Sequence, residues 1–252
     1  MEEIAETSIL LNAGKIAPAH GIDGRILEFF EICIHQLVFL HRLYPIGIFS
    51  KKQKYGIAIH TSEHPELNSY IKKCLSTAQD LIRTGDFEQL IIVFNKPDET
   101  PFRKFTFALE GLSKDTTESV NRNDFTSLEL SFRDAVLRLV GCDRKMETFH
   151  KIPEGSSFKI LIETSEDSFI NMCNAPSSKD EYEFPWVQSE GKVASATYDQ
   201  LIPISSVETR NLSLQIIAHE SLMVSAEENN HKSQNSSVIT DEENNTAMSE
   251  EY

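Results

Sequence analysis

Apolar residues recur with helical spacing in three stretches of the chain. Between residues 24 and 43 they surround nearly the whole circumference of the expected helix, which is typical of a central, buried helix. Asp23 is its expected N-cap. A second helix carries Pro65 in its first turn and ends before Gly85, and a third spans about residues 124–141. The second and third helices each present one apolar face.

Other stretches alternate between apolar and polar residues or form short apolar runs, as strands do. A hairpin at residues 46–59 carries lysines at its expected tip, residues 50–54, for which a solvated turn is favoured over a contact with a partner or DNA. From residue 165 to about 200 the sequence is polar and irregular. The remaining strands are expected at 87–94, 102–109, 158–162, 201–204 and 212–217. This order of elements predicts an α+β domain with an antiparallel sheet, in which a long irregular segment is commonly functional.

Composition narrows the classes of function. The formal net charge is −15, and residues 226–252 hold seven acidic residues and one lysine, so the rest of the chain is acidic as well. Such a surface repels phosphate backbones, which disfavours direct DNA binding as the main function. No apolar run reaches the length of a membrane span, and the acidic start lacks the features of a secretory signal. We therefore expect a reducing compartment with four free thiols.

Catalytic motifs are not evident in the sequence. It contains no glycine-rich phosphate loop, nucleophile elbow or His-Glu-x-x-His motif. His60 and His64 stand four residues apart but straddle a strand end and a helix start, so we expect two surface residues and no metal pair. The four cysteines are too far apart for a structural zinc site. An enzyme would need a convergent acid–base or nucleophile cluster, and we predict neither catalysis nor a cofactor.

Five short segments carry a resemblance to a known family. They are YPIGIF at 44–49, KKQKY at 51–55, HPELNSYI at 64–71, FPW at 184–186 and LIP at 201–203. Together they resemble the HORMA-domain accessory subunits of translesion DNA polymerase zeta, the mitotic-arrest-deficient-like proteins. The resemblance implies a HORMA domain at 22–222, with three helices packed on an antiparallel sheet and a C-terminal safety belt at about 165–220. Residues 1–21 are then an expected flexible lead-in, and 223–252 an expected disordered acidic tail.

The resemblance implies a peptide clamp. In the family the belt wraps a proline-containing peptide of the catalytic polymerase subunit, and the residues that contact it match Tyr70, Pro185 and Trp186. An extended peptide can add a strand to an open sheet edge, and proline packs well on aromatic rings. Each aromatic residue also has a simpler explanation. Tyr70 borders the apolar face of its helix, and Trp186 could be an ordinary core residue.

Two further surfaces follow from the resemblance. The first binds the C-terminal domain of the scaffold translesion polymerase and matches Leu201, Gln215 and Ile217, although the family usually has an aromatic residue where this chain has Ile217. The second forms a HORMA dimer and matches Arg133. A salt bridge between Glu129 and Arg133, four residues apart on a helix, explains Arg133 as well.

The implied protein is a non-catalytic adaptor in translesion synthesis and DNA repair. It is expected in the nucleus and, as a second compartment, in the cytoplasm. Its implied partners are the polymerase zeta catalytic subunit, the scaffold polymerase, a second HORMA domain and an AAA+ remodeller, without cofactor, membrane or sequence-specific nucleic acid. The alternative is a spindle-checkpoint or meiotic HORMA adaptor that clamps peptides of mitotic regulators, and the segment at 44–71 favours the polymerase subunit.

Overall fold

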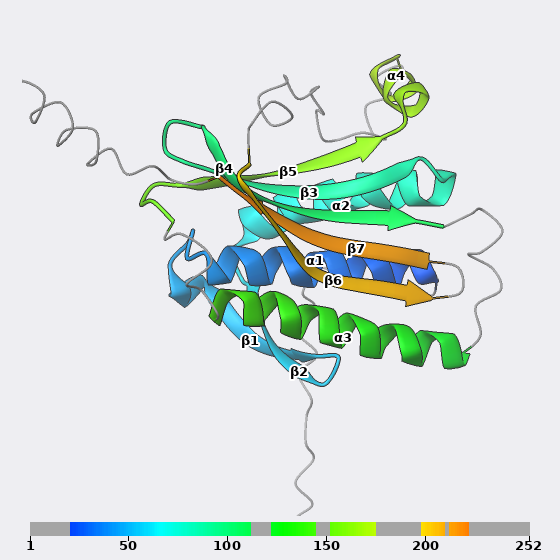
Figure 1. The fold of residues 1–252 in the computed structure, drawn as a ribbon, viewed down its shortest axis with the longest axis horizontal. Helices are drawn as coiled ribbons and strands as arrows, with labels where there is room; N and C mark the ends of the chain where they lie inside the picture. Colours follow the sequence, from blue (N-terminus) through cyan, green and yellow to red (C-terminus); the bar gives the residue numbers. More distant parts are fainter. Residues whose placement is uncertain (1–20, 112–121, 145–151, 175–197, 210–211, 222–252) are drawn as a thin grey trace, which may run out of the picture. The chain divides into compact units, whose positions relative to one another are not determined.

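The computed structural model describes residues 21–111, 122–144, 152–174, 198–209 and 212–221, which lie within one compact unit. The helices in these ranges are α1 (Ile22–Leu40), η1 (Ile46–Ile48, a 3-10 turn), α2 (Pro65–Thr84), α3 (Arg122–Arg144) and α4 (Glu166–Asn174) (Figure 1). The strands are β1 (Phe49–Lys54), β2 (Ile57–Ser62), β3 (Phe87–Asn95), β4 (Pro101–Glu110), β5 (Ser157–Thr164), β6 (Gln200–Thr209) and β7 (Leu212–Glu220). None of these helices is long and apolar enough to cross a membrane.

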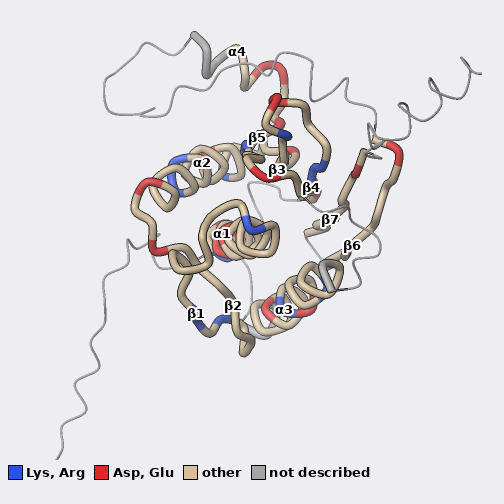
Figure 2. Tube along the Cα trace, turned by 90° about the vertical axis from the view of Figure 1, so that its left-hand side faces the viewer, with Lys and Arg blue, Asp and Glu red and all other residues tan. Residues whose placement is uncertain are grey.

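The sheet has five antiparallel strands in the order β5-β3-β4-β7-β6, and β1 and β2 form a separate hairpin. Helices α1, α2 and α3 lie on one face of the sheet, with α1 between the sheet and the hairpin (Figures 1 and 2). Aromatic rings join these layers. Phe30 of α1 contacts Phe107 of β4, with ring centroids 5.8 Å apart, and Phe29 stacks on Phe132 of α3 at 4.3 Å. The predicted α+β architecture of three helices on an antiparallel sheet is confirmed.

The start of α1 differs from the prediction. Gly21, with extended backbone, is the N-cap, and Asp23 lies inside the first turn. Its carboxylate accepts hydrogen bonds from Arg83 Nε at 3.0 Å and from Gln79 Nε2 at 3.3 Å. Asp23 therefore ties α1 to α2, because a carboxylate in the first turn suits the helix dipole and here also finds a cationic partner.

The β1–β2 hairpin turns later than predicted. Tyr55 and Gly56 form the two-residue turn, both with positive φ, 49° and 70°. Such turns match the twist of the flanking strands, which explains why the reversal occurs at Tyr-Gly. Lys51, Lys52 and Lys54 consequently belong to β1 and are not at the tip.

The segment after β5 also differs from the prediction of irregular sequence from 165 to 200. Its first part, Glu166–Asn174, is the helix α4, with Glu166 and Asp167 in its first turn. Acidic residues there stabilise a helix through the dipole without needing an apolar stripe. The remainder of that stretch up to residue 197 is outside the described residues. Strand β6 extends to Thr209, five residues beyond its predicted end.

A buried polar network joins β4, β7 and the end of α1. Arg103 and Glu220, only 0% and 1% exposed, form an ion pair between Arg103 NH2 and Glu220 Oε1. Arg103 NH1 donates to Nε2 of His41 at 2.9 Å, so His41 Nδ1 carries the hydrogen and donates to the Leu37 carbonyl at 2.8 Å. The His41 ring stacks on Phe94 with centroids 4.2 Å apart. The charge of Arg103 is thus compensated inside the core.

Two buried histidines predict a fall in stability on mild acidification. Burial lowers the pKa of His41 to about 3, with Arg103 contributing, and lowers that of His35 to about 4, with Lys52 contributing. The unfolded chain, whose histidines titrate near pH 6.5, therefore binds more protons than the folded one below that pH. We expect urea unfolding to show a loss of about 2 kcal/mol between pH 7 and 5.5. His35→Asn should make that slope shallower, and a pH-independent midpoint would contradict the argument.

Candidate partner-binding site

Strand β5 is one of the two end strands of the sheet among the described strands. Its inner side pairs with β3 from Ser157 to Thr164. The outer side of an end strand presents N–H and C=O groups to which an extended peptide can pair. A clamp that binds an extended peptide needs such an edge, because the peptide pairs with the strand through its backbone.

Tyr70 of α2 lies beside that edge. Its hydroxyl oxygen accepts a hydrogen bond from the N–H of Ile160, in the middle of β5, at 3.0 Å. An N–H that donates to a side chain on α2 is not engaged in the ladder with β3. Successive N–H groups of a strand point to opposite sides, so this one marks the outer side of β5. The structure thus places Tyr70 at the outer edge of β5, in addition to the helix border that the sequence indicated.

An aromatic cluster surrounds the start of β5. The rings of Tyr70 and Phe158 meet edge to face with centroids 5.8 Å apart, and Tyr44 meets Phe158 in the same way at 6.5 Å. All three side chains are half-buried. Phe158 was not singled out in the sequence, where it is one apolar residue of a strand. Its aromatic side chain is the one feature of the sequence that could have pointed to Phe158, since exposed aromatic faces suit apolar or proline-containing peptides.

The electrostatic state of Tyr70 suits such a ligand. Burial raises the pKa of its phenol well above the usual range, with smaller contributions from Cys74 and Tyr44. The group stays neutral at physiological pH and combines an apolar ring with a hydroxyl. Pro185 and Trp186, predicted to complete the pocket, lie outside the described residues.

Leu201, Gln215 and Ile217 come together on one face of the β6–β7 hairpin. In the register Leu201 pairs with His219 and Pro203 with Ile217, so these residues share the side opposite buried Leu214. Leu201 is 60% exposed, Gln215 is exposed and Ile217 is half-buried. The predicted alternation of β7 is confirmed. The binding role of this face stays a prediction.

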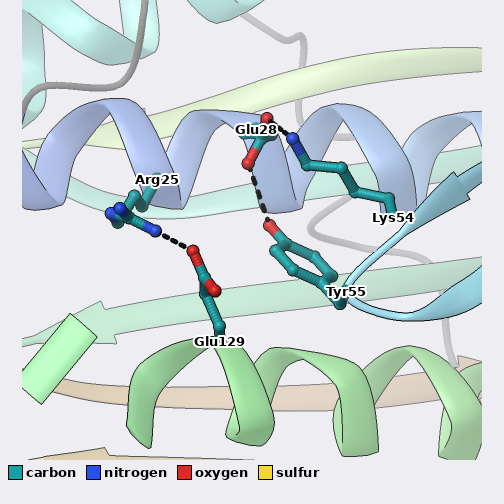
Figure 3. A network of polar contacts seen from close by, with 5 residues as sticks. All are labelled: Arg25, Glu28, Lys54, Tyr55 and Glu129. Atoms are coloured by element: carbon teal, nitrogen blue, oxygen red, sulfur yellow. Dashed lines mark hydrogen bonds and ion pairs between the residues drawn. The ribbon is translucent and has the colours of Figure 1, made fainter. Parts of the chain in front are cut away.

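Arg133 is exposed on α3, and the explanation by a Glu129–Arg133 salt bridge is wrong. Glu129 instead forms an ion pair with Arg25 of α1, which also lies over the Phe125 ring at 4.6 Å. Figure 3 shows this pair next to a second contact group, in which Glu28 of α1 meets two residues of the hairpin. Within the described ranges Arg133 forms no ion pair. It is flanked by exposed Leu130 and Leu137.

The histidines considered as metal ligands have structural roles. His60 stacks on Phe39, with centroids 3.8 Å apart, and His64 is the N-cap of α2 and accepts from the Leu67 N–H. In the part of the chain that the structure describes, no group of three His, Cys, Asp or Glu residues is placed to hold a metal ion. The described cysteines, Cys33, Cys74 and Cys142, are not in disulfide bonds.

Solved structures with the same arrangement define the class of protein. A chain of the Mitotic Checkpoint Complex superposes with a TM-score of 0.64 over 79% of this chain and 98% of the other, at 18% identity. HTP-2 of C. elegans bound to HTP-3 motif-6 superposes with a TM-score of 0.56 over 80% and 90%, at 11% identity. The chain therefore has the HORMA-domain fold.

Sequence relatives narrow the class further. The mitotic spindle assembly checkpoint protein MAD2B of Rattus norvegicus is 29% identical over 211 residues, 83% of this chain and 93% of the relative. The human MAD2B protein matches over the same shares. The DNA polymerase zeta subunit 2 of Drosophila melanogaster is 24% identical over 76% of this chain and 94% of its own length. No family model matches the chain. The chain thus has the HORMA-domain fold and is similar in sequence, over most of its length, to MAD2B proteins and to a polymerase zeta subunit 2.

Proposed function

We propose that this protein is a non-catalytic adaptor subunit of DNA polymerase zeta that clamps a proline-containing peptide of the catalytic subunit. The observation that carries the proposal is the outer edge of β5, an end strand among the strands that the structure describes, beside which α2 places the Tyr70 ring. A peptide laid along this edge pairs through its backbone, while its side chains pack on Tyr70, Phe158 and, in our proposal, Trp186. The belt then closes over the peptide and slows its dissociation.

The relatives' names support the choice of partner. Homologues are named as polymerase zeta subunits in Drosophila melanogaster, Arabidopsis thaliana and Schizosaccharomyces pombe. In the proposed complex the outward face with Leu201, Gln215 and Ile217 binds the C-terminal domain of the scaffold translesion polymerase and bridges the two enzymes. The proposal includes a nuclear location and opening of the belt by an AAA+ remodeller.

A second candidate function has its own support. The solved neighbours include a chain of the Mitotic Checkpoint Complex and HTP-2 bound to an HTP-3 closure motif, so the same fold also occurs in a mitotic checkpoint complex and in a protein that binds a partner's motif. The MAD2B relatives carry a spindle-checkpoint name. In this alternative the β5 edge takes a peptide of a mitotic regulator.

Purification of the tagged protein from DNA-damaged cells separates the two functions. We expect the catalytic subunit of a B-family polymerase to co-purify, and we expect Tyr70→Ala to deplete it. Arg138→Ala, which alters an exposed side chain of α3 away from β5, is the matched control and should retain the polymerase. Recovery of spindle or meiotic proteins without a polymerase subunit would favour the alternative.

The exposed face of α3 leads to a prediction about self-association. We propose that Arg133, with Leu130 and Leu137 beside it, contributes to a HORMA dimer. Charge reversal by Arg133→Glu is expected to shift the peptide-bound protein from dimer to monomer mass in light scattering, because the reversed charge faces the partner. Arg138→Glu makes the same change about 140° further round the helix and should leave the mass unchanged. An unchanged dimer mass for Arg133→Glu would refute the role of this residue.

A further inference from the structure

A cavity of about 650 Å³ lies between α1, the β1–β2 hairpin and the first half of α2. Each element contributes one face to it. The two helices line it with residues at i, i+3, i+4 and i+7 spacing, which lie on one side of a helix. The hairpin contributes Lys52, Lys54, Ile59 and Thr61, which alternate onto one face, together with Gln53 and Ser62. The volume is that of a site for a small molecule or a few peptide residues.

The charges lining the cavity are partly neutralised by the protein itself. Glu28 forms an ion pair with Lys54 and accepts a hydrogen bond from the Tyr55 hydroxyl at 3.5 Å (Figure 3). Lys52 of β1 and Lys72 of α2 form no ion pair with any described residue. Figure 2 shows basic segments on both α2 and the hairpin, with α1 between them. Two uncompensated ammonium groups thus approach the cavity from different elements.

The remaining acidic residue of the cavity, Glu31, does not cancel the positive charge of the two lysines, so the net charge of the lining favours an anion. Burial raises the pKa of its carboxyl, Glu28 adds to the shift, and Lys52, Lys54 and Lys72 oppose it. Even with Glu31 fully ionised, the two free lysines exceed it by one positive charge. The cavity therefore differs in sign from a protein whose formal net charge is −15.

Neutral polar groups add donors and acceptors. The Ser62 N–H donates to His35 Nδ1 at 3.3 Å, so the hydrogen of this neutral imidazole is on Nε2. Asn68 donates through Nδ2 to the Ser62 carbonyl at 2.9 Å, but its Oδ1 and the Thr61 hydroxyl have no hydrogen-bond partner among the described residues. Unused polar atoms of this kind are costly in a protein interior and are expected where a ligand supplies the partner.

We propose that this cavity binds an anionic side chain, phosphoryl or carboxylate, of a protein partner, held between Lys52 and Lys72. A single anionic group gains from both lysines, whereas a long polyanion such as nucleic acid meets the acidic remainder of the surface. The site is independent of the clamp. At 100° per residue, Tyr70 points away from the side of α2 that carries Asn68 and Lys72, so a partner can occupy both sites.

The proposal can be tested on the full-length protein with three fluorescent seven-residue peptides. They are identical except for the central residue, which is phosphoserine, glutamate or serine. We expect saturable binding of the phosphoserine peptide, weakened by salt, and none of the serine peptide. Binding of the glutamate peptide as well would identify the site as one for carboxylates too. Amide shifts of the 15N-labelled protein should map to Thr61, Asn68 and Ser69.

Single substitutions locate the site. Lys52→Gln and Lys72→Gln are each expected to weaken binding roughly tenfold, the effect of one charge-assisted hydrogen bond. Lys51→Gln, which removes the same charge from the opposite face of β1, should leave binding unchanged. Equal binding of all three peptides, an equal loss in Lys51→Gln, or amide shifts confined to other surfaces would overturn the proposal. Unchanged melting temperatures verify that the variants, which alter exposed lysines, are folded.

Discussion

Replacing Glu220 with alanine is expected to lower the free energy of unfolding by about 3–5 kcal/mol, because it breaks a buried ion pair by removing the carboxylate that binds the Arg103 guanidinium. Arg103 of β4 is fully buried with its guanidinium over the Phe102 ring, and its NH2 group donates to Glu220 on β7. Water cannot replace the lost carboxylate at a site where both side chains are at most 1% exposed. The donor contact to His41 carries no charge and does not replace the ion pair.

Urea unfolding at pH 7 measures this effect, with the exposed Glu208→Ala of β6 as a control that should change stability little. The double variant Arg103→Met with Glu220→Leu should recover most of the loss, since apolar residues of similar volume often replace a buried ion pair without cost. A loss below about 1 kcal/mol in Glu220→Ala would show that the pair is solvated in solution.

Removing either aromatic residue of the proposed clamp is expected to weaken binding of the catalytic subunit's peptide about 30-fold. This corresponds to about 2 kcal/mol, a usual cost of truncating an aromatic anchor. Trp186→Ala tests the belt and Tyr70→Ala the helix. Tyr70→Phe keeps the ring but frees the Ile160 N–H, so it should retain most of the affinity if ring packing dominates.

Calorimetric titration of the proline-containing peptide into each folded variant provides the measurement. Arg138→Ala, an exposed residue of α3, is the control and should bind like the unmodified protein. Unchanged affinity in a folded Trp186→Ala protein would contradict the clamp. A loss in Tyr70→Phe as large as in Tyr70→Ala would instead assign the effect to the hydroxyl and the backbone of β5.

The helices with strong apolar periodicity were predictable from the sequence, because burial imposes that spacing on them. The helix α4 was not, since a nine-residue helix outside the core needs no apolar stripe. The hairpin turn was misplaced because lysines indicate exposure as readily in a strand as in a turn. Asp23 has the residue type of an N-cap, but its partner Arg83 is sixty residues away and gives no local signal.

For the candidate sites too, features that depend on neighbouring residues were predictable from the sequence, whereas contacts between distant segments were not. Tyr70 was selected through a family resemblance, and only the structure places its hydroxyl on the N–H of Ile160. The alternation along β7 correctly placed Gln215 and Ile217 on the outward face. The cavity between Lys52 and Lys72 combines three elements, and no pattern within one element reveals it.

The position of β7 beside β4 also has a consequence for folding during synthesis of the chain. Arg103 and Glu220 are 117 residues apart, so the partner strand of β4 is synthesised long after β4 itself. At about 5–20 residues per second, the interval is on the order of ten seconds. During that time β4, with Phe105 and Phe107, has an unpaired edge on the side later covered by β7. The nascent protein is therefore most exposed to mispairing in this interval, and chaperone protection matters most there.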